Sequence, residues 1–266
     1  MKHETLEVLR SPSSKESLQL GPKDGREELV SASGESFPIV DGIPVFLREN
    51  DVNDLNLKFQ KMYDWFSHIY DLVERIYGRF LFKMNTVKGR RRMVNTLELR
   101  EGCRIIEVSI GTGVNFLAMR EDFPRSARLY GLDISMGMLR RCGRNARRWR
   151  LDIELINGMA EALPFKDESF DVVFHVGGIN FFNDKKKAIE EMIRIAKRGS
   201  RLLISDETEK YTKETYERSI TVGRYYSNRA GEVKVPLDLI PKEMEEVKCE
   251  LVAGERFYVI TFRKPA

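Results

Sequence analysis

The sequence has few cysteines, no long apolar run and no strong excess of one charge. Its 266 residues include only Cys103, Cys142 and Cys249, and no two of them have Cys-x-x-Cys spacing. That scarcity argues against a disulfide framework or a cysteine-based zinc site. No run of about 18 apolar residues occurs, and the charged start MKHETLEVLR is unlike a signal peptide. We therefore expect a soluble, cytoplasmic protein without a membrane span.

The excess of basic residues is also small. The net charge is +4, from 45 basic and 41 acidic side chains, which by itself does not indicate a nucleic-acid-binding protein. Basic residues do cluster at 88–92, 140–150 and 185–187. Such runs are more often solvated helix faces than phosphate-binding tracks. A nucleic-acid partner is therefore the less favoured alternative.

The chain divides into three parts of different composition. Residues 1–48 combine short apolar pieces with turn-forming Gly, Pro, Ser and Asp, which predicts a small β-rich module. Turn residues then nearly vanish, and apolar residues recur at spacings of three and four, which predicts a helical cap over 49–99. Residues 100–266 form the third part, with an insertion at 207–246 that we expect to help shape a substrate pocket.

In the third part, short apolar strands alternate with amphipathic helices. This alternation predicts an α/β fold with a mostly parallel sheet covered on both faces. Two final strands, joined through residues 253–255, suit an antiparallel hairpin at the sheet edge. The expected strands are 103–108, 128–132, 152–156, 170–175, 201–205, 247–252 and 256–262, and the expected helices are 114–122, 136–149, 184–197 and 241–246.

A glycine loop follows the first of these strands. In Ser109-Ile-Gly-Thr-Gly113 the two glycines fall where the chain turns from strand into helix, which allows a ligand to approach the backbone closely. Ordinary turns use the same pattern, so the loop alone does not show that a ligand binds there. Asp133 ends the next strand, about twenty residues further on, where a carboxylate can accept both hydroxyls of a ribose.

Neighbouring positions distinguish between two nucleotide-like ligands. The dinucleotide fingerprint requires a third glycine where this chain has Phe116, and no Arg or Lys follows the loop closely to hold a pyrophosphate. Instead, the acidic Glu107 ends the first strand. A cationic ligand without phosphates suits this acid better, and the ammonium of S-adenosylmethionine would be complemented by Glu107 directly or through water.

Four blocks carry a family resemblance over about residues 103–207. They are EVSIGTGVN, LYGLDISMGML, NGMAEALPFKDESFDVVF and IEEMIRIAKRGSRLLISDE. With these blocks the chain resembles the class I S-adenosylmethionine-dependent methyltransferases, in particular the group that includes the ubiquinone/menaquinone-biosynthesis C-methyltransferases. The resemblance implies a Rossmann-like sheet, S-adenosylmethionine as cofactor, and methyl transfer to a small-molecule or lipid-like acceptor of quinone or aromatic type.

The resemblance also implies where the cofactor lies. Its ribose would meet Asp133, its adenine would lie between Ile134 and residues 159–161, and its methionine end would face residues 109–113. Three places depart from the family, which usually has glycine at Ser109, aspartate at Met159 and a Pro-Gly-Gly turn at residues 198–200. The expected cofactor-binding residues are Tyr70, Glu107, Ser109, Gly111, Gly113, Asn115, Asp133, Ile134, Met138, Met159, Ala160 and Glu161.

Few residues are obligatory for methyl transfer, because the sulfonium is already a good leaving group. His175, at the end of the strand at 170–175, is the candidate general base, with Glu161, His68 and Tyr70 as less favoured candidates. The alternative interpretation of His175 is a histidine that packs against the cofactor or in the core. Asn180, Phe181 and Phe182 follow it and are candidates for the acceptor side. Tyrosines of the 207–246 insertion, including Tyr211, would add an apolar wall with polar tips.

The N-terminal module resembles a small zinc-ribbon domain that is fused ahead of several methyltransferases. Residues 35–47, ESFPIVDGIPVFL, match its closing signature, while Ser11 and Ser14 stand where it carries Cys-Pro-x-Cys. Serine is a poor zinc ligand, so we predict the fold without its metal. Two further functions stay open, an RNA methyltransferase and a non-catalytic S-adenosylmethionine-binding scaffold.

Overall fold

The computed structural model describes residues 2–23, 26–47, 96–216 and 232–266. Most of the predicted helical cap at 49–99 lies outside these ranges, and Tyr70 lies outside them too. Part of the predicted insertion at 207–246 is also outside. None of the described helices is long and apolar enough to cross a membrane.

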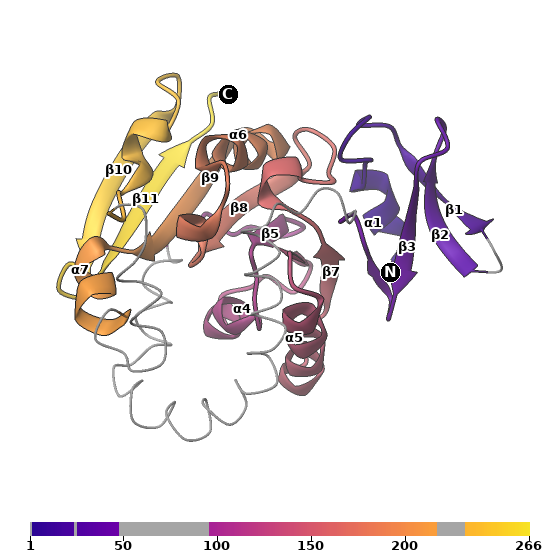
Figure 1. Ribbon diagram of the computed structural model, residues 1–266, viewed down its shortest axis with the longest axis horizontal. Helices are drawn as coiled ribbons and strands as arrows, with labels where there is room; N and C mark the ends of the chain where they lie inside the picture. Colours follow the sequence, from indigo (N-terminus) through magenta and orange to yellow (C-terminus); the bar gives the residue numbers. More distant parts are fainter. Residues whose placement is uncertain (1, 24–25, 48–95, 217–231) are drawn as a thin grey trace.

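The main domain is built on one seven-stranded sheet, shown in Figure 1. Its order is β10-β11-β9-β8-β5-β6-β7, with β5 to β9 parallel and β11 antiparallel to both β9 and β10. This confirms the predicted parallel sheet with an antiparallel edge hairpin. The strands are β5 (Arg104–Val108), β6 (Arg128–Asp133), β7 (Ile153–Asn157), β8 (Phe170–Val176), β9 (Ala196–Glu207), β10 (Glu245–Val252) and β11 (Phe257–Arg263).

Helices cover both faces of this sheet because its strands are apolar on both sides. Helices α4 (Val114–Met119) and α5 (Met136–Trp149) pack on one face, where Phe116 and Leu139 belong to the same buried cluster as Ile105. Helix α6 (Lys185–Ile195) packs on the other face, where Ile189 belongs to the same buried cluster as Ile106. The predicted bounds hold for α5, whereas α4 ends three residues early and α6 two residues early.

The helix predicted at 241–246 was wrong. Strand β10 begins at Glu245, which pairs with Arg263 of β11, so pairing with the sheet overrides the local helical pattern. The helical turn of this region is instead a 3-10 helix, η5 (Pro236–Leu239), with the proline at its start. Further upstream, the short helix α7 (Glu209–Tyr211) follows β9 and leads into the π-helical turn η4 (Thr212–Tyr216).

The N-terminal part is a separate four-stranded antiparallel sheet preceded by a short helix, which confirms the predicted β-rich module. Its tightest hairpin turns at Asp41 and Gly42, whose φ angles of 54° and 78° are typical of the Asp-Gly type I′ turn. The elements are α1 (His3–Val8), β1 (Leu18–Lys23), β2 (Arg26–Ser31), β3 (Ser36–Val40) and β4 (Ile43–Pro44).

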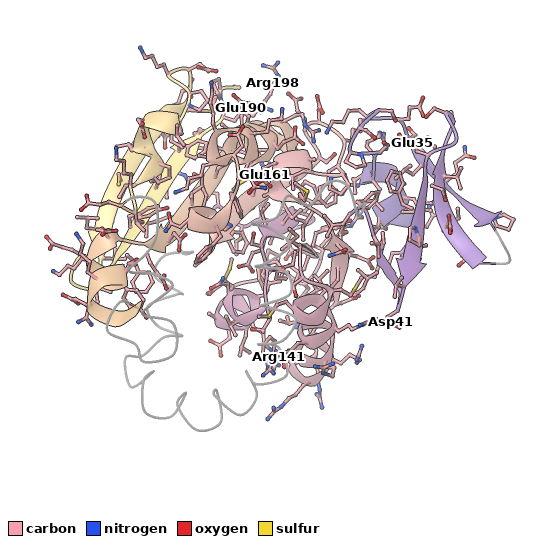
Figure 2. The ribbon with its side chains drawn as sticks, viewed as in Figure 1. Glu35, Asp41, Arg141, Glu161, Glu190 and Arg198 are labelled. Atoms are coloured by element: carbon pink, nitrogen blue, oxygen red, sulfur yellow. The ribbon has the colours of Figure 1, made fainter. Side chains whose placement is uncertain are left out.

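This module covers the β7 edge of the main sheet. Val45 forms a parallel bridge with Asn157, and Leu9 forms an antiparallel bridge with Phe165. Leu9 is fully buried, in the same apolar core as the main domain. At the other end, Asp41 reaches Arg140 of α5 at 2.8 Å, and Figure 2 shows it on the side that faces α5. The module therefore packs directly against the main sheet and α5.

A hydroxyl–carboxylate cluster joins two segments of the module. The side chains of Ser11, Ser13 and Ser14 all donate to the carboxylate of Glu35, the last at 2.6 Å. Among the described residues, no group of three or more histidine, cysteine or acidic side chains is arranged to hold a metal ion. The contacts tie residues 11–14 to the turn before β3, and the zinc-ribbon likeness stays a prediction.

Gly131, in the middle of β6, allows the glycine loop to lie against the sheet. A Cβ atom at this position would lie 2.3 Å from Cδ1 of Ile110 and 3.0 Å from its Cγ2. We expect Gly131→Ala to lower the free energy of unfolding by about 1 to 3 kcal/mol, as overpacking does in well-packed cores. Urea unfolding would measure the loss.

The matched control is Gly143→Ala in α5, where the new Cβ would meet only ordinary contacts, at 3.5 Å from Leu155. That substitution should stabilise slightly, because alanine is the better helix former. Adding Ile110→Ala to Gly131→Ala should recover part of the packing loss. Equal effects of the two glycine substitutions would contradict the close-packing explanation.

Candidate cofactor and acceptor site

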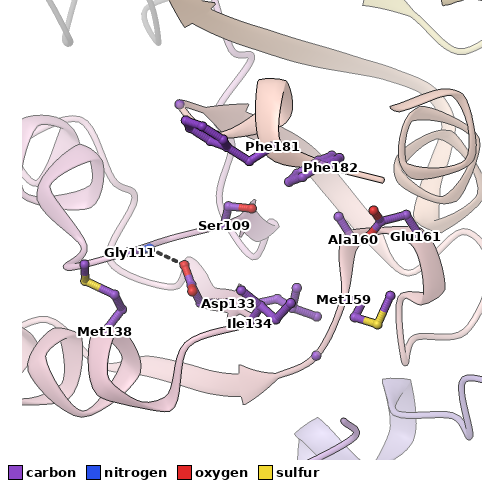
Figure 3. A pocket seen from close by; sticks show the side chains of 14 residues that line it. Ser109, Gly111, Asp133, Ile134, Met138, Met159, Ala160, Glu161, Phe181 and Phe182 are labelled. Carbon is purple, nitrogen blue, oxygen red and sulfur yellow. Dashed lines mark hydrogen bonds between the residues drawn. The ribbon is translucent and has the colours of Figure 1, made fainter. Parts of the chain in front are cut away.

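The candidate site lies at the carboxyl ends of the parallel strands, where the chain leaves β5 between its neighbours β6 and β8. Ligands of open α/β sheets bind at this switch point. A cavity opens there, shown in Figure 3, and the turns after β5, β6, β7 and β8 all contribute to it. Its lining residues are Ser109, Gly111, Leu132, Asp133, Ile134, Met138, Gly158, Met159, Ala160, Glu161, Gly177, Gly178, Phe181 and Phe182.

The glycine loop turns sharply through left-handed backbone conformations. Ser109, Gly111 and Gly113 have φ angles of 63°, 55° and 82°. A Cβ on Gly111 would meet nothing within 4 Å, so this residue leaves open space on the cavity side. A Cβ on Gly113 would lie 2.8 Å from the sulfur of Cys142, so this glycine allows α4 to start close to α5. Ser109 holds a conformation that costs a non-glycine residue about 1 kcal/mol.

Asp133 links the loop to the end of β6. Its Oδ2 accepts a hydrogen bond from the backbone N–H of Gly111 at 2.8 Å, drawn in Figure 3, and its Oδ1 accepts from that of Ser135 at 2.9 Å. A carboxylate offers about four lone-pair positions, so both oxygens can accept further bonds. The side chain is 7% exposed and lines the cavity. It is therefore fixed in place and suited to accept ribose hydroxyls.

The charge of the cavity wall is negative. Asp133 and Glu161 are its only charged lining residues within the described chain, and Glu161 is oriented by the backbone N–H of Asn183, 3.0 Å from its Oε1. A pyrophosphate would find no cation among these lining residues, whereas a sulfonium or ammonium group is favoured there. The open space at Gly111 and the paired acids therefore fit S-adenosylmethionine.

Two predicted cofactor-binding residues are buried and do not line the cavity. Glu107 is fully buried, and its Oε1 accepts from the side-chain amide of Asn115, which is also buried. Neither residue lines the cavity. Burial raises the pKa of the Cys142 thiol, and the nearby Glu107 carboxylate adds to this shift. Contact of Glu107 or Asn115 with the cofactor stays a prediction.

His175 lies in the core below the cavity and does not line it. Its side chain is fully buried, and Nδ1 lies 2.8 Å from the carbonyl oxygen of Val108. A carbonyl can only accept, so Nδ1 carries a proton, and complete burial favours the neutral form of the ring. Burial lowers the pKa of His175 to about 4. Such a weak base away from the cavity is poorly placed for the predicted catalytic role, and its ring packs on Phe182 at 5.2 Å.

The sequence interpretation did not single out the turn after β8. Gly177 and Gly178 line the cavity with φ angles of 85° and 110°, next to the predicted Phe181 and Phe182. The glycine pair directly after an apolar strand was the available signal, as it was for the loop after β5. Leu132 and Gly158 were also missed as lining residues.

Asp206, near the end of β9, fixes the turn after β8 through hydrogen bonds to its backbone. It accepts hydrogen bonds from the backbone N–H groups of Gly178 at 3.2 Å and Asn180 at 3.1 Å. Burial raises the pKa of Asp206 despite these bonds. Lys185 extends the network, because its Nζ donates to Oδ1 of Asn180 at 3.0 Å. Asn180 thus supports the turn rather than forming part of the described cavity wall.

The aromatic wall expected from the insertion is only partly described. Tyr211 packs on Phe257 of β11, with ring centroids 5.1 Å apart, and does not line the cavity. The side chain of Tyr216, and the whole of Tyr225 and Tyr226, lie outside the described residues. Within the described ranges, the aromatic side chains that line the cavity are Phe181 and Phe182.

Comparison with known proteins agrees with this geometry. Residues 106–204 match the family model described as a methyltransferase domain. The demethylmenaquinone methyltransferase of Renibacterium salmoninarum is 33% identical over 145 residues, which are 54% of this chain and 56% of that protein. The ubiquinone/menaquinone biosynthesis C-methyltransferase of Geobacter sulfurreducens is 31% identical over 56% of this chain and 59% of its own length. The chain thus spans little more than half the length of these relatives.

Solved structures show the same fold. A SAM-dependent methyltransferase from Thermotoga maritima superposes with a TM-score of 0.54 and 23% identity, covering 77% of this chain and 99% of that one. The cyclase SpnF superposes with a TM-score of 0.60 and 15% identity, covering 78% of this chain and 96% of that one. Because a cyclase shares the fold, the fold alone does not fix the reaction.

Proposed function

We propose that this chain, whose residues 106–204 are a class I S-adenosylmethionine-dependent methyltransferase domain, transfers a methyl group to a small-molecule or lipid-like acceptor of quinone or aromatic type. One observation carries the proposal. A single cavity joins the carboxylates of Asp133 and Glu161 to the rings of Phe181 and Phe182. The acids suit a cationic cofactor, and the rings suit a flat apolar acceptor.

Each wall of the cavity has its own part in holding the cofactor. Asp133 accepts the ribose hydroxyls, Ile134 and residues 159–161 enclose the adenine, and the loop at 109–113 faces the methionine end. Bound S-adenosylmethionine supplies an electrophilic methyl carbon on a good leaving group. The chain then has to align the acceptor for in-line attack and exclude water. The loop at 109–113 and the turn after β8 would carry out this alignment. The buried carboxylates of Asp133 and Asp206 hold them in place through hydrogen bonds to Gly111 and Gly178.

The cavity suits acceptors that need little help in losing a proton. Among the described residues, its lining includes no histidine, lysine or cysteine. An activated ring carbon or a phenolate oxygen is already nucleophilic and needs only a modest base. Demethylmenaquinone appears in the name of the Renibacterium relative, and its reduced, hydroquinone form has an electron-rich ring of this kind, which supports a quinone-type acceptor here.

The RNA alternative has less support. Arg140, from one predicted basic run, is paired with Asp41 at 2.8 Å. In a second run, Lys186 lies 3.9 Å from Glu190 and Lys185 is bonded to Asn180. Side chains in intramolecular contacts are less available to phosphates. The third run, at 88–92, lies outside the described residues.

Transfer of labelled methyl groups tests the proposal. The protein is incubated with methyl-tritiated S-adenosylmethionine and cell extracts, which are then separated into RNA, protein and organic-soluble fractions. We expect the label in the organic-soluble fraction, and far less there with Asp133→Ala when S-adenosylmethionine is below saturation. Reduced demethylmenaquinone, added in purified form, should take up label as well. Label confined to RNA would overturn the proposed acceptor class, and cofactor binding without any transfer would favour the scaffold alternative.

A further inference from the structure

The two edges of the seven-stranded sheet differ. The β7 edge is bridged by Val45 of the N-terminal module. At the opposite edge β10 is the outermost strand, as Figure 1 shows, and it pairs only with β11 among the described residues. Seven of its eight residues are exposed. An open edge presents unpaired N–H and C=O groups that can pair with another strand.

The side chains of β10 divide into two kinds along the strand. Val247, Cys249 and Leu251 project to one face, and Val247 and Leu251 are 42% and 54% exposed. Lys248 and Glu250 project to the other face and carry opposite charges. Alternation follows from the strand period of two. The strand thus has an apolar stripe on one face and a charged pair on the other.

We propose that β10 pairs antiparallel with β10 of a second copy of this chain, around a two-fold axis that passes through Cys249. In this register Lys248 of each copy faces Glu250 of the other, so two opposite-charge pairs form on one face. On the other face Val247 faces Leu251 twice, and the two Cys249 residues face each other. Directly opposed pairs of both kinds stabilise antiparallel strands.

Neighbouring registers do not have this complementarity. With the axis through Lys248, two lysines would oppose each other. With the axis through Glu250, two glutamates would oppose each other. With the axis between Lys248 and Cys249, Val247 would oppose Glu250. Because like charges directly opposite one another destabilise a strand pair, the register through Cys249 is favoured.

The local shape of β10 sets the extent of the contact. Its register with β11 shifts between Glu245 and Lys248, and Glu246 has a φ of 50°. The carboxylate of Glu246 turns to Arg263 at 3.0 Å and is not available at the edge. Pairing is therefore confined to residues 247–251. An interface of this size belongs to the small, weak class, so we expect a dimer that is populated at micromolar concentration.

Charge reversal tests the proposed strand pairing, and a double variant that restores the opposite charges serves as the rescue. Sedimentation equilibrium of the full chain should show a monomer–dimer equilibrium. Lys248→Glu and Glu250→Lys should each raise the dissociation constant about tenfold, because each creates two like-charge pairs. The double variant should restore the original value. Lys234→Glu, an exposed lysine away from the strand, is the matched control.

Cross-linking tests the register itself. Opposed Cα atoms in an antiparallel pair lie about 4.5 to 5.5 Å apart, within the range that a disulfide spans. Diamide should therefore produce a covalent dimer, and Cys249→Ser should abolish it, because Cys103 and Cys142 are buried. A chain that stays monomeric up to about 100 µM would overturn the proposal. A dimer that neither charge reversal nor Cys249→Ser affects would overturn it as well.

Discussion

Replacing Asp133 by alanine should weaken binding of S-adenosylmethionine by at least about 100-fold. In the proposed complex this carboxylate accepts both ribose hydroxyls, and hydrogen bonds to a charged group contribute about 1.5 to 3 kcal/mol each. Asp133→Ala removes both bonds, together with the support that Oδ2 gives to the N–H of Gly111. Asp133→Asn keeps the shape but loses the charge, so a smaller loss is expected. Isothermal titration calorimetry with S-adenosylmethionine measures both.

The matched control is Asp238→Asn, in the exposed part of η5, which should leave the affinity unchanged. Thermal unfolding of Asp133→Asn checks that the loop and the sheet remain intact. Affinities of both Asp133 variants within threefold of the original protein would contradict the ribose assignment. The cofactor would then be held in another way, and the proposed roles of Ile134 and Met159 would have to be revised as well.

A second large effect is expected from pH, through His175. Its folded-state pKa of about 4 lies below the ordinary value of 6.5, because complete burial disfavours the charged ring. Between these two values the unfolded chain binds the proton and the folded chain does not. The stabilising contribution is therefore complete above pH 6.5. It is lost as the pH falls towards 4, by about 3 kcal/mol in total.

Comparison with a variant separates the effect of His175 on the pH dependence of stability from the effect of the carboxylates. His175→Asn keeps an N–H donor near the carbonyl of Val108 but does not titrate. We expect its unfolding free energy, measured in urea between pH 7 and pH 4, to fall about 3 kcal/mol less than that of the original protein. His3→Asn, at an exposed histidine, should follow the original protein. Parallel curves for His175→Asn and the original protein would contradict the buried neutral imidazole.

Sequence patterns predicted most of the sheet because its strands are short, apolar and separated by turn residues. Helix α5 was predicted with its bounds because its sequence is amphipathic, and the structure adds that Ser135 caps its start. The failure at 241–246 has a physical reason. Charged residues such as Lys242 and Glu245 suit a helix locally, but pairing of β10 with β11 decides the conformation.

The cofactor site was predicted in part for a related reason. Asp133, Gly111 and Met159 follow strands that the sequence marks clearly, and all three line the cavity. The position of a residue in the sequence does not show whether its side chain is buried or lines the cavity. Glu107 and His175 also end strands, yet both face the interior. Gly177 and Gly178 were missed because their importance depends on β8 lying beside β5.

The sequence by itself determined the class of fold and the family resemblance, because periodicity and the four blocks are local properties. It also indicated the cationic, phosphate-free nature of the ligand, because the loop at 109–113 is flanked by acids. The tertiary structure alone decided which of these residues reach the cavity, because strand order and burial are set by contacts between distant segments. It likewise revealed the open β10 edge, because an edge exists only once the other strands have paired.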